Sequence, residues 1–146
     1  MEKIQLSLEE RIQKLEDKEE IRSLLANYCH SIDKLDREGF LSLWDEEARW
    51  VLSNNESYGK EEIKERYDNA IKGAKVLHHH TTNSAIEISG DWATVISDLF
   101  FYREDAQTGN TVLMSAVYKD EFSKSTGKWL FKKRVSVPHT NKSPKF

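Results

Sequence analysis

The stretch HHTTNSAIEISGDWATVISDLFFYR, residues 79–103, decides the predicted fold because it reads as two strands joined by a tight turn. Gly90-Asp91 divides it, and such a pair between two strand-like runs is a typical hairpin signal. The run Leu99-Phe100-Phe101-Tyr102 is apolar on both faces, which favours a long strand in a curved sheet. We therefore predict strands over His79–Ser89 and Trp92–Arg103.

Two more strands are expected downstream, at Thr111–Ser123 and Trp129–Val137. Turn residues set them off, at Thr108-Gly109-Asn110 and Thr126-Gly127-Lys128. Consecutive strands joined by such short turns predict an antiparallel meander.

The first half of the chain shows helical patterns instead. From Ser7 to about Lys34 apolar residues recur at helical spacing, Ser7 is a suitable N-cap, and the charged segment Glu16–Glu20 is a candidate kink or break. Further elements are expected in this order: a short helix capped by Asp36 and running through Trp44, a strand at Arg49–Leu52, a polar turn at Ser53–Ser57, and a helix over Lys60–Ile71 ended by Gly73.

Helices that precede a run of strands indicate the α+β class. We expect N-terminal helices packed on a curved antiparallel sheet, closing it into a cone-shaped α+β barrel. No repeat or linker divides the chain, so residues 1–146 are predicted to form one domain with a loose polar tail over about 138–146.

Composition excludes several classes of protein. The 22 Lys and Arg against 25 Asp and Glu give a net charge of -3, whereas nucleic-acid binders usually carry a basic excess. Met1 to Gln5 lack the apolar run of a signal peptide, and no segment is long enough to span a membrane. A single cysteine, Cys29, cannot form an internal disulfide and is typical of packing rather than nucleophilic chemistry. We expect a cytoplasmic protein.

Asp33 and His79 are the residues that offer a catalytic pair. An imidazole and a carboxylate that meet in a pocket form a general base able to remove a proton from carbon. Asp33 follows the apolar stripe that includes Tyr28 and Ile32, so its side chain either points inward beside a buried tyrosine or faces solvent at the end of the helix.

The three consecutive histidines cannot all share one metal ion, because adjacent strand residues face opposite ways. His78 and His80 could chelate as a pair, but no other cluster of metal ligands is evident, and we predict neither metal nor cofactor. Strict alternation places these two, and not His79, on the face of Ile86 and Ile88. His79 can share that face only if a β-bulge intervenes.

Arg134 falls on the last predicted strand, on the face opposite Phe131 and Val135. It could bind a leaving anion or a substrate carboxylate, or it could be a solvated strand cation. Aromatic residues that could line an apolar ligand cavity are Trp44, Trp50, Phe101 and Tyr102.

From about Leu8 to Val137 the sequence resembles SnoaL-like proteins of the nuclear transport factor 2-like superfamily. The similarity rests on segments in a characteristic order, namely Glu19–Tyr28, Ile32-Asp33, Leu43–Trp50, His79–Asn83, Gly90–Ala93 and Ala116–Phe122. Within that superfamily it is nearest to hexachlorocyclohexane dehydrochlorinase and, more distantly, to scytalone dehydratase.

This resemblance implies an Asp–His dyad at Asp33 and His79. It therefore also implies a β-bulge after His79, because strict strand alternation would otherwise place His79 on the outer face. A basic residue of some dehydrochlorinases falls on Arg134, whereas a lysine of their pocket is replaced by Tyr28, which could bind a substrate oxygen. The resulting prediction is a cofactor-independent lyase or isomerase, of the dehydratase or dehydrohalogenase kind, acting on a small apolar molecule.

The same fold also serves proteins without catalytic activity. The alternative is a small-ligand-binding or assembly protein, favoured if Tyr118 and Phe122 lie on an exposed outer face of the sheet. In either case a broad sheet face predicts a homo-oligomer, either a dimer or a trimer.

Overall fold

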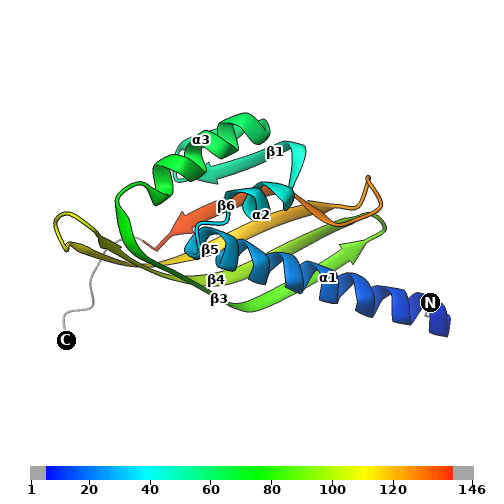
Figure 1. The fold of residues 1–146 in the computed structure, drawn as a ribbon. Helices are drawn as coiled ribbons and strands as arrows, with labels where there is room; N and C mark the ends of the chain where they lie inside the picture. The colour runs from blue at the N-terminus through cyan, green and yellow to red at the C-terminus, as the bar shows by residue number, and fades with distance from the viewer. Residues whose placement is uncertain (1–5, 140–146) are drawn as a thin grey trace.

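The computed structural model describes residues 6–139. Along the chain the elements are α1 (Leu8–Asp33), α2 (Arg37–Ser42), β1 (Trp44–Leu52), β2 (Asn55–Tyr58), α3 (Gly59–Ile71), β3 (Ala74–Ser89), β4 (Trp92–Asp105), β5 (Thr111–Ser123) and β6 (Leu130–Pro138). The helices lie on one side of the curved sheet (Figure 1). This confirms the α+β class.

The six strands form one open sheet in the order β2-β1-β6-β5-β4-β3. From β3 to β6 they make the expected antiparallel meander. The first and last long strands, β1 and β6, are parallel, with Trp50 opposite Arg134 and Val51 opposite Val135. The prediction of a purely antiparallel sheet was therefore wrong, because no hairpin turn connects β1 to β6 and fixes their direction.

Several helices and strands begin or end at other residues than the sequence predicted. Asp36 caps α2, but the helix ends at Ser42, and Trp44 already belongs to β1. The expected polar turn over Ser53–Ser57 is shorter, since Asn55 begins β2. Pro138 belongs to β6 rather than to a loose tail, and residues 140–146 lie outside the described residues.

The core between the helices and the concave face of the sheet is largely aromatic. Its fully buried members come from both helices and strands: Tyr28, Phe40, Trp44, Tyr67, Phe122 and Phe131. Among the described residues, no helix is long and apolar enough to cross a membrane.

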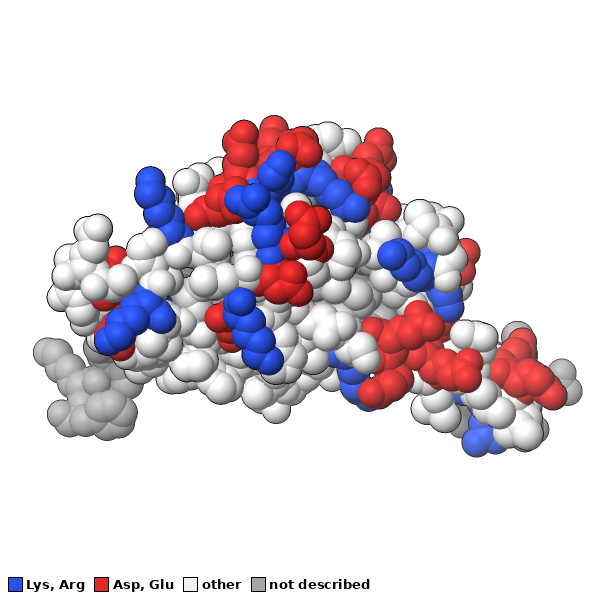
Figure 2. Space-filling view, in the orientation of Figure 1, with Lys and Arg blue, Asp and Glu red and all other residues white. Residues whose placement is uncertain are grey.

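Helix α1 begins at a capping box in which Ser7 and Glu10 satisfy each other's backbone groups, and it continues through Glu16–Glu20 without a break. Its first half projects beyond the sheet (Figure 1), so the apolar residues Leu8, Ile12 and Leu15 of this half are exposed to solvent. Only from Asp17 onward is the helix covered. Acidic side chains gather along α1 and over α3, with Lys and Arg among them (Figure 2).

Asp17 anchors the middle of α1 to the end of the sheet. Its carboxylate accepts hydrogen bonds from Lys124 Nζ at 2.6 Å and from the Trp129 indole at 2.9 Å. Burial would raise the pKa of Asp17, but these hydrogen bonds outweigh it and hold the pKa below its usual value. A charge in the middle of the helix is therefore an attachment point rather than a break.

A β-bulge in β3 decides which histidine faces the core. Thr82 pairs with Asp98 and Ala85 with Ile96, so β3 carries one residue more than β4 between these pairs. Asn83 takes the left-handed conformation, with φ 53°, and its side-chain amide donates to Asp98 at 2.9 Å. The extra residue lets His79 share the inner face with Ile86, as the resemblance implied.

We predict that Asp17→Asn lowers the free energy of unfolding by about 1–3 kcal/mol at pH 7, because the charged hydrogen bonds are weakened. Since the pKa of Asp17 is lowered in the folded protein, its carboxylate stabilises the fold above the unfolded value of about 3.9 and loses this effect as the pH falls through the folded value. The difference between wild type and variant in urea denaturation should therefore shrink as the pH falls below about 4. An unchanged difference at low pH would contradict this assignment.

We also predict that Asn83→Gly lowers the free energy of unfolding by about 1 kcal/mol or less, through loss of its hydrogen bond to Asp98, and that Asn83→Val lowers it by about 1–2 kcal/mol more. Glycine adopts a positive φ readily, but a β-branched side chain does not. Urea denaturation of the two variants measures the difference. A valine variant as stable as the glycine variant would show that the bulge does not depend on this backbone conformation.

Candidate functional site

Asp33 and His79 meet between the end of α1 and β3. Asp33 Oδ1 lies 2.6 Å from His79 Nδ1, and Asp33 Oδ2 accepts a hydrogen bond from the backbone N–H of His79 at 2.9 Å. One carboxylate thus fixes both the ring and the backbone of the same residue. With Nδ1–H donating to Asp33, the neutral imidazole keeps Nε2 as its free basic nitrogen.

The pair is shielded from solvent but not sealed. The side chains of His79 and Asp33 are 8% and 15% exposed. Phe101 packs on the imidazole with ring centroids 4.6 Å apart, and Tyr28 meets it edge-on at 6.1 Å. These contacts leave the ring little freedom to rotate, so its orientation is set by the fold.

His79 borders a mostly apolar cavity of about 150 Å³ between the helices and the concave face of the sheet. A cavity of roughly this size holds a single benzene ring. The lining residues are Tyr28, Ile32, Trp50, Leu52, Ala70, Leu77, His79, Leu99, Phe101, Met114, Tyr118 and Ser136.

The predicted aromatic residues divide into two groups. Trp50 and Phe101 line the cavity, as does Tyr28. Trp44 does not, because it is fully buried in the core against Phe131. Tyr102 lies on the outer face of the sheet beside His78, since successive strand residues face opposite ways and Phe101 points inward.

Arg134 is completely buried, so both its predicted strand face and the alternative of a solvated cation were wrong. The register between β5 and β6 shifts next to Lys132, which brings Arg134 to the same inner face as Phe131. Its guanidinium donates to both carboxylate oxygens of Asp120, at 2.8 and 2.7 Å. Burial opposes the charge on Arg134, but Asp120 holds its pKa above the ordinary value.

The guanidinium of Arg134 also lies 4.0 Å from the ring centroid of Tyr28 and 3.8 Å from that of Tyr118. Arg134 therefore makes cation–π contacts with these two cavity-lining tyrosines, while Arg134 itself is not part of the lining. A role in direct contact with a ligand does not follow from this arrangement.

Tyr118 is the lining residue that the sequence analysis misplaced. It and Phe122 were candidates for an exposed outer face, yet both are buried on the inner face. The alternation of Tyr118 and Phe122 with Lys119 and Glu121 was a usable signal, because the charged pair belongs on the solvent side.

Burial raises the pKa of Tyr28 to about 12, although the charge of Arg134 and hydrogen bonding with Tyr118 act in the opposite direction. Burial likewise raises the pKa of Tyr118. Both phenols therefore remain protonated near neutral pH and can act as hydrogen-bond donors.

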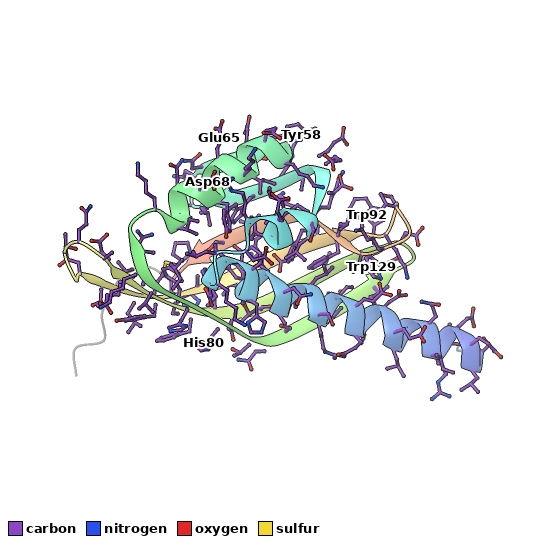
Figure 3. The ribbon with its side chains drawn as sticks, viewed as in Figure 1. Tyr58, Glu65, Asp68, His80, Trp92 and Trp129 are labelled. Carbon is purple, nitrogen blue, oxygen red and sulfur yellow. The ribbon has the colours of Figure 1, made fainter. Side chains whose placement is uncertain are left out.

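The other candidate groups take no part in the site. His78 and His80 are exposed, and His80 points away from the helices on the outer face (Figure 3). Within residues 6–139, no group of three or more His, Cys, Asp or Glu side chains could hold a metal ion. Burial raises the pKa of the Cys29 thiol, which lies 3.2 Å from the Thr81 hydroxyl, so it remains a neutral packing group.

Comparison with known proteins agrees with this architecture. A curated γ-hexachlorocyclohexane dehydrochlorinase from Sphingobium indicum is 25% identical over 128 residues, covering 84% of this chain and 81% of the relative. A candidate scytalone dehydratase from Novosphingobium aromaticivorans superposes with a TM-score of 0.81 at 20% identity, covering 87% of each chain. An NTF2-like protein with a cystatin-like fold from the same organism gives a TM-score of 0.77 at 23% identity, covering 92% of this chain and 88% of its own.

The model of the SnoaL-like domain matches residues 13–135, which include every lining residue of the cavity except Ser136. The chain therefore belongs to the SnoaL-like domain family and has an NTF2-like fold.

Proposed function

We propose that the protein is a cofactor-independent lyase or isomerase that removes a proton from carbon in a small, largely apolar molecule. The observation that carries this proposal is the bidentate contact of Asp33 with His79 at the wall of an apolar cavity. A histidine held in one tautomer, with its basic nitrogen free beside a ligand-sized space, has the arrangement of a general base.

In the proposed reaction, His79 Nε2 takes the proton from carbon, and the electron pair of the C–H bond moves into the substrate. Asp33 stabilises the imidazolium that forms and prevents the ring from turning, as an aspartate does in a hydrolytic triad. The pair of electrons then either expels a leaving group from the neighbouring carbon or, in an isomerisation, accepts the proton back at another position. Neither course needs a metal or an organic cofactor.

Hydroxyl groups would stabilise the negative charge that develops on the substrate by donating hydrogen bonds to it. Tyr28 and Tyr118 line the cavity as protonated donors, and the buried charge of Arg134 lies under both rings. Arg134 acts here through the tyrosines, because Nε and Nη2 are paired with Asp120 and the residue, including its Nη1, which has no partner among the described residues, does not line the cavity. The similarity to a dehydrochlorinase supports the elimination course, with a halide as the leaving group.

We predict that His79→Gln and Asp33→Asn each reduce turnover roughly 10²–10⁴-fold while the circular dichroism spectrum stays unchanged. The assay incubates the enzyme in D₂O with small ketones, β-hydroxyketones and chloroalkanes no larger than a single unsubstituted ring, and follows deuterium uptake and elimination by NMR. Deuterium uptake reports reversible proton removal or isomerisation, and the appearance of an alkene with release of the leaving group reports elimination.

His80→Gln is the matched control, because His80 lies next to the proposed base but on the outer face of the sheet. It should retain wild-type turnover. Full activity of Asp33→Asn, or an equal loss in His80→Gln, would contradict the proposed mechanism. Ligands that bind to the wild type and are released without deuterium and without elimination would instead support the alternative of a non-catalytic ligand carrier.

We further propose that the protein self-associates through the outer face of the sheet. Exposed apolar side chains from three adjacent strands gather there: Ile96, Phe100, Leu113 and Val137. Asp98 and Ser115 are exposed among them on the same face, but a group of apolar residues on one face marks an interface more often than scattered single residues do. A dimer or a trimer would cover it.

We predict that Phe100→Glu shifts the protein toward the monomer in sedimentation equilibrium, because a buried, unpaired carboxylate opposes association. Leu15→Glu is the control, since Leu15 is also apolar and exposed but lies on the projecting half of α1. The mass of the wild-type species distinguishes a dimer from a trimer. A monomeric wild type at all concentrations would rule the interface out.

A further inference from the structure

Arg103 stands at one end of the cavity, at the point where its sheet wall meets its helix wall. On β4, Leu99 and Phe101 line the cavity, and Arg103 follows on the same inner face. Across the strand pair it lies opposite Leu77 of β3, which is also part of the lining. The side chain is therefore the next group beyond the cavity wall.

From this position Arg103 reaches the last turn of α3. Nη1 donates to the carbonyl of Ala70 and Nη2 to that of Lys72, at 2.5 and 2.6 Å. The last carbonyls of a helix have no partner within the helix, and a cation is favourable there. Ala70 is itself a lining residue, so the arginine joins the opposite walls of the cavity.

The segment that follows α3 turns sharply beside this contact. Gly73 has φ 72°, and its carbonyl accepts a hydrogen bond from the backbone of Ala106 at 2.8 Å. The chain then enters β3, next to the β4–β5 hairpin (Figure 1). Gly73 tolerates this backbone conformation at no steric cost, and the turn separates the end of α3 from the start of β3.

We infer that Arg103 is a clasp that closes this end of the cavity and sets the size of the ligand that it admits. With the clasp formed, the space of about 150 Å³ accepts a single ring. A ligand of two fused rings requires the last turn of α3 to move away from β4, which breaks both hydrogen bonds of Arg103. The inference concerns binding and holds whether or not the protein is an enzyme.

A second arginine provides a matched control. Arg37 of α2 holds the same helix by donating from Nε and Nη2 to one carboxylate oxygen of Asp68, at 2.9 and 2.6 Å. Asp68 points outward from α3 (Figure 3), and neither residue lines the cavity. The helix also remains anchored by the buried side chains of Ile63 and Tyr67, so loss of either arginine leaves the fold in place.

The experiment measures the shift in Tm that benzene and naphthalene cause in the wild type, Arg103→Ala, Arg103→Lys and Arg37→Ala. Wild type and Arg37→Ala should be stabilised by benzene and not by naphthalene. Arg103→Ala should gain at least tenfold in naphthalene affinity and keep benzene binding, while Arg103→Lys, which can bond one carbonyl at a time, should fall between them.

The clasp would be overturned if Arg103→Ala kept the wild-type selectivity, if Arg37→Ala gained naphthalene binding to the same extent, or if the wild type bound naphthalene as well as benzene. A wild type that bound neither compound would overturn it too, because the size limit assumes an accessible cavity. None of these outcomes depends on catalysis, so the test is separate from that of the proposed reaction.

Discussion

The contact of Asp33 with His79 is the interaction on which the site depends, because it joins the end of the first helix to the middle of the edge strand β3. The carboxylate binds both the imidazole and the backbone N–H of one residue, so the side chain and its strand are positioned together. Residues 46 positions apart in sequence are thereby fixed within hydrogen-bonding distance. Phe101 and Tyr28 then pack around a ring whose tautomer is already set.

Two irregularities in the sheet give the cavity its chemistry. The bulge at Asn83 turns His79 inward while keeping Ile86 in the core. The register shift next to Lys132 turns Arg134 inward while Phe131 stays in the core. Without the extra residue, the alternation of a strand would place each of these polar groups on the outer face. The polar centre of an apolar core is thus produced by two local departures from regular pairing.

The charge near the cavity is buried and balanced. Arg134 and Asp120 neutralise each other, and the guanidinium lies under the rings of Tyr28 and Tyr118. The polar groups of the residues that line the cavity are the phenols of Tyr28 and Tyr118, the Ser136 hydroxyl, the Trp50 indole and the His79 imidazole, in a wall that is otherwise apolar. Such a lining suits a small uncharged molecule whose charge develops only during reaction.

Local patterns in the sequence determined most of the elements, because caps, turns and periodicity act over a few residues. Ser7 begins α1, Asp36 begins α2, and Gly90-Asp91 joins β3 to β4, each as predicted. Asp33 and His79 could be paired only through resemblance to a family, since pattern alone placed His79 on the wrong face. The tertiary structure decided the parallel pairing of β1 with β6 and the burial of Arg134. These features arise from contacts between distant segments and from single-residue shifts of register, which leave no periodic trace in the sequence.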